Sequence, residues 1–173
     1  YDLYQIDQAL MQGTNLAVFY DPFMEAAPPG MQSPQQQQLA PVVTGLEKLL
    51  EHYGVKVNQS LVLDEKCFKQ RLPEQYGGGE QTIYYAPIIE GAQVNGELPY
   101  MRNIKELITY KIAPLAIDTE RIRQNGLTVH TLFSSSDKSW EMKGQIVLNP
   151  MFIRPPEDGA VMAARPLACI IEG

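Results

Sequence analysis

The spacing of hydrophobic residues at the start of the chain predicts a helix followed by a strand. Apolar side chains recur at three- and four-residue intervals from Asp2 to Met11, which gives a helix one apolar face, and Gly13 suits a left-handed turn at its end. The next run, residues 16–20, is continuously apolar and stops at Asp21. Such a run is typical of a strand covered on both faces by helices. We therefore expect an α/β layer at the start of the fold.

The pattern then changes from polar to amphipathic. Residues 25–40 are rich in Pro and Gln and hold little to bury, which predicts a flexible loop. From Pro41 to Gly54 an apolar stripe at helical spacing predicts a second helix, with proline in its first turn and glycine at its end. Between Lys66 and Gly79 the pattern is irregular, and no element is predicted there.

Most of the remaining pattern predicts strands. Asp118 is placed to cap a short helix that runs to Arg123 and ends at Gly126. The predicted fold class is a single α/β domain over residues 1–173, with a mostly parallel sheet flanked by helices and an additional strand-rich part. Runs rich in β-branched and aromatic residues predict strands or final apolar segments at residues 55–57, 61–63, 82–89, 108–117 (interrupted by Pro114), 127–133 and 160–171.

Composition places the chain among ordinary globular domains and excludes one class of partner. It is 45% hydrophobic and 20% charged, with 14 basic and 20 acidic residues and a net charge of −6. Because Lys and Arg form no cluster, we expect no nucleic-acid partner. No apolar run approaches the roughly 20 residues of a membrane helix. The chain begins at Tyr1 with a helix as its first element, so we expect targeting and anchoring segments outside these residues, in a larger protein.

Groups of short motifs occur in a fixed order over most of the chain. The groups lie at residues 10–23, 49–64, 131–140 and 166–173, and they include Asp21-Pro22-Phe23, Tyr53-Gly54-Val55, Ser134-Ser135-Ser136 and Lys138-Ser139-Trp140. The ordered set resembles a GldG-like auxiliary component of ABC-type transport systems, of the gliding-motility type, because both order and spacing match.

The resemblance implies a glutamine-amidotransferase-like (flavodoxin-like) α/β fold without the catalytic residues of that fold. It also implies a periplasmic domain at the extracytoplasmic face of the bacterial inner membrane, anchored by segments outside this chain. Its implied partners are the permease and ATPase subunits of an ABC transporter. We therefore expect a non-enzymatic domain that binds a partner subunit or an envelope component and needs no cofactor.

Polar and aromatic residues follow two of the expected strands, and these residues form the candidate site. In an open α/β sheet, ligands bind outside the carboxyl ends of the strands, so the set is placed to bind a small polar ligand or a partner peptide. Its members are Asp21, Phe23, Ser134, Ser135, Ser136 and Trp140. The alternative is structural: the acid caps a turn, the serines satisfy backbone groups at a strand end, and the tryptophan fills the core.

A different class of function stays open as an alternative. A small-molecule hydrolase or amidotransferase-like enzyme, active or degenerate, would use Cys67 or Ser135 as its nucleophile, and the lysines that flank the cysteine are placed to lower its thiol pKa. Cys67 and Cys169 lie about a hundred positions apart, and we expect two unpaired, buried thiols. A third hypothesis, a purely structural spacer, predicts no concave pocket near Asp21.

Two motifs that suggest ligands are better explained as turns and surface. Residues 77–79 are three glycines, but a strand follows them where a phosphate loop requires a helix N-terminus. Asp64 and Glu65 lack the alternate spacing of a calcium loop, so we expect both at the solvated surface. The sequence therefore predicts no metal site.

Overall fold

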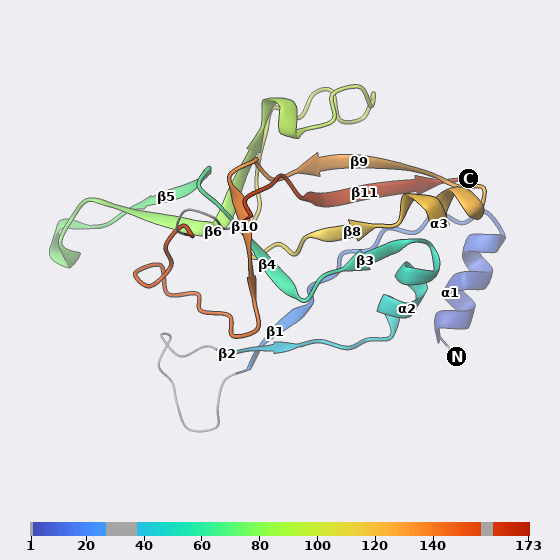
Figure 1. The fold of residues 1–173 in the computed structure, drawn as a ribbon, viewed down its shortest axis with the longest axis horizontal. Coiled ribbons are helices and arrows are strands. Elements are labelled where there is room, and N and C mark those ends of the chain that lie inside the picture. The colour runs from blue at the N-terminus through green and yellow to red at the C-terminus, as the bar shows by residue number, and fades with distance from the viewer. Residues whose placement is uncertain (1, 27–37, 157–160) are drawn as a thin grey trace.

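The structure is a computed structural model that describes residues 2–26, 38–156 and 161–173 (Figure 1). The helices in these ranges are α1 (Asp2–Met11), α2 (Leu46–His52) and α3 (Thr119–Gln124), with short 3₁₀ helices η2 (Glu74–Tyr76) and η3 (Gly91–Gln93). The strands are β1 (Phe23–Ala26), β2 (Gln38–Pro41), β3 (Val55–Val57), β4 (Ser60–Asp64), β5 (Cys67–Arg71), β6 (Glu80–Glu90), β7 (Glu106–Ile108), β8 (Leu115–Ile117), β9 (Thr128–Ser134), β10 (Ser139–Lys143) and β11 (Pro166–Glu172).

The strands pair antiparallel and form small sheets. In the described ranges, four sheets have two strands each, β1–β2, β3–β8, β4–β10 and β9–β11, and the fifth has the order β5–β6–β7. Among the described residues, no parallel sheet is flanked by helices. The fold class expected from the sequence is therefore wrong, and with it the crevice that a parallel sheet would provide.

The reason lies in the first 20 residues. The apolar run 16–20 does not join a sheet, and its Phe19 side chain is 98% exposed. Helix α1 has the predicted bounds but contains no buried residue, so it does not cover a sheet. A buried parallel strand needs apolar helix faces on both sides, and neither the run nor the helix meets this requirement here.

Strand β4 is the centre of the packing, and all five of its residues are buried. Side chains alternate between the two faces of a strand, and those of β4 enter two different hydrophobic cores. Leu61 and Leu63 pack with Phe23 and Trp140 in the first core, whereas Val62 packs with Ile89 in the second. One edge of β4 pairs with β10, and on the other the Val62 amide donates to the Ile112 carbonyl at 2.9 Å.

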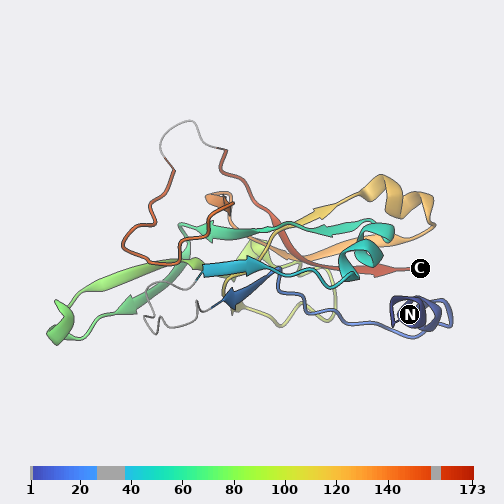
Figure 2. The ribbon, with the colours of Figure 1, turned by 90° about the horizontal axis from the view of Figure 1, so that it is seen from below.

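The molecule is elongated, and its two ends are built from different secondary structure elements (Figure 1). The three α-helices and the C-terminus lie at one end, and the hairpin of β5 and β6 extends from the other. Seen from below, α1 and the segment after it run along one side of the molecule (Figure 2). In the described ranges, no helix is long and apolar enough to span a membrane.

Some boundaries agree with the sequence pattern and others do not. Helix α3 begins as expected, because the Asp118 carboxylate accepts a hydrogen bond from the Arg121 amide at 3.0 Å. The second helix begins at Leu46, since Pro41 instead ends β2 opposite Phe23. Strand β5 occupies a region where no element was predicted, and residues 109–114 are not strand. Of the predicted loop 25–40, residues 27–37 lie outside the described residues.

Gly54 provides a test of the packing between the α2 end and α3. Its φ is +85°, and a Cβ there would lie 2.5 Å from Ile122 Cγ1 and 3.1 Å from the Asp118 carbonyl. We expect Gly54→Ala to lower the free energy of unfolding by about 2–5 kcal/mol, from backbone strain plus overpacking. Gly126→Ala, at φ +71° with open space around it, should cost only about 1–2 kcal/mol. Equal losses in urea unfolding would contradict the close packing at Gly54.

Candidate functional site

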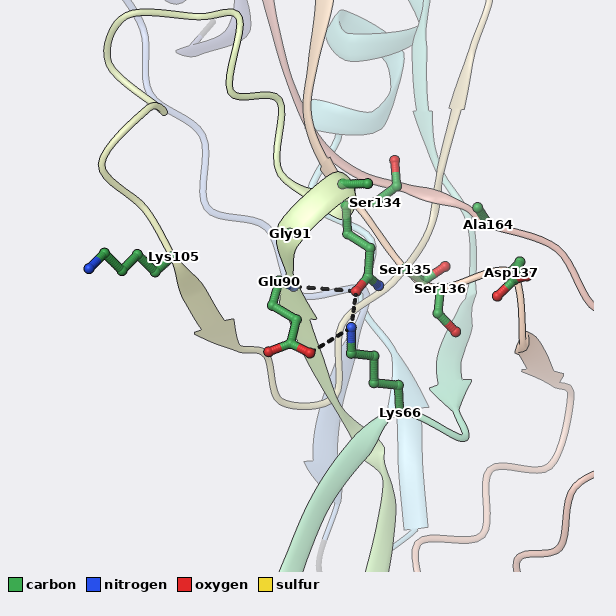
Figure 3. Close-up of a pocket in the computed structure, with 11 residues that line it drawn as sticks. Lys66, Glu90, Gly91, Lys105, Ser134, Ser135, Ser136, Asp137 and Ala164 are labelled. Carbon is green, nitrogen blue, oxygen red and sulfur yellow. Dashed lines mark hydrogen bonds and ion pairs between the residues drawn. The ribbon is translucent and has the colours of Figure 1, made fainter.

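The three predicted serines at the end of β9 lie beside an open depression of about 750 Å³ (Figure 3). Ser134, Ser135 and Ser136 form one side of it, and Asp137 continues the same turn. η3 and the end of β6 form the opposite side. Lys66 lies between this side and the serines, and Lys105 lies further out. The depression is therefore lined by hydroxyls, two ammonium groups and two carboxylates, of which Lys66 and Glu90 are in contact and Lys105 lies apart (Figure 3).

Lys66 is fixed by its contacts with the end of β6 and with η3. Its ammonium lies 2.8 Å from the Glu90 carboxylate and donates to Gln93 Oε1 at 3.0 Å (Figure 3). Glu90 and Gln93 also hold each other as a capping box at the start of η3. The Gln93 amide nitrogen is buried and has no hydrogen-bond partner among the described residues. Lys66 and Glu90 are thus already paired with each other.

The carboxylate of Asp64 lies beneath the serine turn and is fully buried. It accepts hydrogen bonds from the Lys66 amide at 2.9 Å, from the Ser136 amide at 2.7 Å and from Ser136 Oγ at 2.5 Å. A buried carboxylate is stable only when hydrogen bonds replace its water, and these three donors supply them. The expectation that Asp64 lies on the solvated surface is therefore wrong.

Ser135 belongs to a second buried network, which centres on Arg165. Ser135 Oγ and Ser139 Oγ lie 2.6 Å apart, and Ser135 Oγ accepts from the Arg165 amide at 2.9 Å. The Arg165 guanidinium donates to the carbonyls of Ser139 at 2.7 Å and Ala163 at 2.6 Å. Its Nε donates to Glu141 at 3.0 Å. The hydroxyl of Ser135 is therefore part of a fixed structural network.

Glu141 completes the network from β10. Its other oxygen accepts from Ser60 Oγ at 2.8 Å and lies 3.3 Å from the Lys143 ammonium. Burial acts to raise the pKa of this carboxyl, but the hydrogen bonds from Ser60, Arg165 and Lys143 together hold the pKa below its ordinary value. The side chains of Glu141 and Arg165 are each only 15% exposed. They form a partly buried ion pair that links β10 to the segment before β11.

The other predicted site residues do not line the depression. Asp21 is exposed, and its carboxylate accepts from the Phe23 amide at 3.0 Å, a local turn contact. Phe23 and Trp140 are buried together in the first core. The six candidates are thus divided between the depression, a turn and the core.

Tyr20, next to Asp21, fixes the chain to the start of α2. Its hydroxyl donates to Glu47 at 2.5 Å and to the Val42 carbonyl at 3.2 Å, while Glu47 also accepts from the Thr44 and Gly45 amides. Burial and the contact with Glu47 raise the pKa of Tyr20 to about 12. The hydrogen bond from Tyr20 is the main cause that lowers the pKa of Glu47 to about 2. This pair anchors the apolar run 16–20 at its end.

Neither proposed nucleophile is activated by its surroundings. Burial, with Asp64 as a second cause, raises the pKa of the Cys67 thiol to about 11, and the opposing effect of Lys69 is smaller. Cys67 is buried and Cys169 partly buried, and both thiols are free. His130 lies 3.7 Å from Glu172 on the β9–β11 pair. Within the described ranges, no group of three or more His, Cys, Asp or Glu side chains is arranged to hold a metal ion.

Sequence reasoning found the serine turn but missed the groups that hold it. Arg165 was part of a run interpreted as apolar, Lys66 was considered only as a neighbour of Cys67, and Glu90 carried no motif. Ser136 and Asp64 lie 72 positions apart in the sequence. One local signal for Asp64 was available, because it directly follows a continuously apolar strand, where a buried acid can accept hydrogen bonds from a neighbouring turn.

The Arg165–Glu141 pair can be tested by removing its cation. We expect Arg165→Met to lower the free energy of unfolding by about 2–4 kcal/mol, because it leaves a partly buried carboxylate without its partner. The double variant Arg165→Met with Glu141→Gln should recover part of this loss. Arg154→Met, at an exposed arginine, is the matched control and should change stability by less than about 0.5 kcal/mol. A double variant less stable than the additive sum would contradict the pairing.

The lowered pKa of Glu47 predicts a pH dependence of stability. Its pKa falls from the ordinary value of 4.5 to about 2 on folding, so the folded state favours the carboxylate. The resulting stabilisation is complete above pH 4.5 and is lost progressively as the pH falls toward 2. In that window, urea unfolding of Glu47→Gln should vary less with pH than unfolding of the unsubstituted protein. Glu51→Gln, at an exposed pair with Lys56, should leave the slope unchanged.

Comparison with known proteins gives one family and one curated relative. The chain is 30% identical over 109 residues to an uncharacterized protein of Borreliella burgdorferi. The match covers 61% of the chain and 20% of the relative, so the aligned part spans about a fifth of that longer protein. No solved structure matches the chain.

The family comparison covers the whole chain. The model of the family described as "ABC-type uncharacterized transport system" matches residues 1–173. The resemblance found in the sequence is confirmed at this level, as an auxiliary component of an ABC-type transport system. The chain therefore belongs to the ABC-type uncharacterized transport system family.

Proposed function

We propose that this domain is a non-catalytic, partner-binding part of the auxiliary component. The observation that carries the proposal is the state of the two candidate nucleophiles. Cys67 is buried with a raised thiol pKa, and Ser135 Oγ is held between Ser139 and the Arg165 amide. A nucleophile needs a positioned base and access to its substrate, whereas Cys67 is buried and Ser135 Oγ is part of the network between β10 and the segment before β11.

The depression supports binding more than chemistry. It is wide and open, and its paired charges and fixed hydroxyls present donors and acceptors without a reorganisation of the site. Preorganised polar groups of this kind confer specificity on a protein contact. Among the described residues, the side chains of Ser134, Lys105 and Asp137 make no hydrogen bond or ion pair, and Lys105 and Asp137 are exposed, so these groups are offered to a partner.

The partners and the location rest on the sequence. The ordered motifs resemble GldG-like components of the gliding-motility type, and this resemblance supports a location at the extracytoplasmic face of the bacterial inner membrane. Its partner there is the permease of the transport system or an envelope component, and the ATPase belongs to the same assembly. The antiparallel fold leaves this proposal intact, because function depends on the surface presented and not on fold class.

Co-purification separates binding from catalysis. The full auxiliary component should co-purify with the permease and ATPase of its own transport system, and Cys67→Ala should co-purify to the same extent and support the same transport rate. The reason is that a thiol with a pKa of about 11 is almost entirely protonated near neutral pH and does no nucleophilic chemistry.

Two results would contradict the proposal. One is a failure of the unsubstituted component to co-purify with either transporter subunit. The other is a Cys67→Ala variant that keeps the complex intact but loses transport. Iodoacetamide labelling of the folded protein is the accompanying control, because Cys67 should react only when the protein is unfolded in urea.

A further inference from the structure

The residues after α1 form an unpaired extended segment, defined here as residues 15–19. The composition of the run 16–20 is that of a strand, with Val, Phe and Tyr in succession. Nevertheless, in the described part of the chain no backbone N–H or C=O of residues 15–19 takes part in a hydrogen bond. An extended, unpaired backbone is a template for the addition of another strand.

The side chains of the unpaired segment are also exposed. Phe19 is 98% exposed, Leu16 45% and Val18 37%. Exposed apolar residues grouped on one stretch of chain mark an interaction site more strongly than scattered ones do. The segment runs along one side of the molecule, between α1 and β1 (Figure 2).

Both ends of the unpaired segment are fixed, which keeps it extended. Before it, the Thr14 amide donates to the Ala9 carbonyl at 3.0 Å. After it, the Tyr20 hydroxyl is held by Glu47, and the Val42 amide donates to the Pro22 carbonyl at 2.9 Å. A segment already held in the bound conformation pays less conformational entropy when a partner pairs with it.

Charge decides which partner fits. Residues 1–47 contain no Lys or Arg, and their acidic residues are Asp2, Asp7, Asp21, Glu25 and Glu47. A second copy of the chain would bring like charges together, and an anionic membrane would be repelled in the same way. Glu25 is already paired with Lys111, and the acids that flank the segment along the chain, on α1 and at Asp21, are complementary to a partner segment with basic residues beside an apolar core.

We propose that residues 15–19 receive an extended segment of a partner protein by strand addition, and that this partner segment has an apolar core with lysine or arginine on its flanks. The inference rests on the proposed function, since it names the surface and the chemistry of the partner. Backbone hydrogen bonds would pair the two segments, and Phe19 and its neighbours would make the apolar contact. The acidic residues on α1 and at Asp21 would select a partner with basic flanks.

Peptide binding to the full auxiliary component tests the proposal. The probe is a fluorescein-labelled peptide with the core Val-Thr-Val-Thr-Val between two pairs of lysines, and fluorescence anisotropy measures its affinity. Phe19→Asp should weaken binding about tenfold or more through loss of apolar contact and added repulsion. Phe152→Asp, at another exposed aromatic residue that is 75% exposed, is the matched control and should bind like the unsubstituted protein.

Backbone pairing has its own pair of variants. Val18→Pro removes one N–H and should weaken binding about tenfold, whereas Val18→Thr keeps the N–H and should bind normally. Circular dichroism checks that each variant is folded. If Val18→Pro is unfolded, the affinity of Phe19→Asp for the peptide tests the proposal in its place. A peptide with glutamates in place of the lysines should bind at least about tenfold more weakly.

Several outcomes would overturn the inference. They are equal affinity for the lysine and glutamate peptides, no loss of affinity in Phe19→Asp, a dimer in light scattering that Phe19→Asp abolishes, or binding to anionic vesicles that it abolishes. If peptide binding fails while the component still co-purifies with its transporter, this inference is wrong and the proposed function stands. If co-purification fails, the proposed function is wrong, whatever the peptides show.

Discussion

The junction between sheets depends on the contacts of the partly buried Arg165 guanidinium. Two-stranded sheets are marginal on their own, and the β4–β10 and β9–β11 pairs meet where this side chain lies. It bonds Glu141 and the Ser139 carbonyl of β10, while its own backbone exchanges hydrogen bonds with Ser135 just beyond β9. A partly buried cation must keep all of these partners, because an unpaired charge in such a place is costly. The β4–β10 and β9–β11 sheets are therefore held in one arrangement relative to each other.

That arrangement explains why β4 can serve two cores. Its odd and even residues face opposite sides, so Leu61 and Leu63 enter one core and Val62 the other. At the end of the strand, Asp64 holds the serine turn through Ser136. The depression is thus positioned by the same strand that organises the packing. The serine turn is held in place because Asp64 and Ser135 beneath it are buried and hydrogen-bonded.

Local elements could be predicted from the sequence, but their partners could not. The bounds of α1, the cap of α3 at Asp118 and strands β3 and β4 followed from spacing and capping alone. The run 16–20 shows the limit of such prediction. A continuous apolar run indicates that a strand is favourable, but it does not indicate which residues cover that strand. For the site, the serines after β9 carried a signal. Their partners, Asp64 and Arg165, became neighbours only through long-range strand pairing, which spacing does not encode.

The difference between the predicted and the observed burial of the run 16–20 is itself informative. A sequence pattern that predicts burial, found exposed in the folded chain, is a local conflict, and such conflicts concentrate at functional sites. The depression and the unpaired segment differ in this respect. In the depression, Lys66, Ser135 and Ser136 are already engaged with neighbours, so a partner gains there mainly specificity. Along residues 15–19 the backbone and the apolar side chains are both open, so a partner gains there hydrogen bonds and buried area. Affinity should therefore arise chiefly from the segment, and the polar depression should select among the partners it admits.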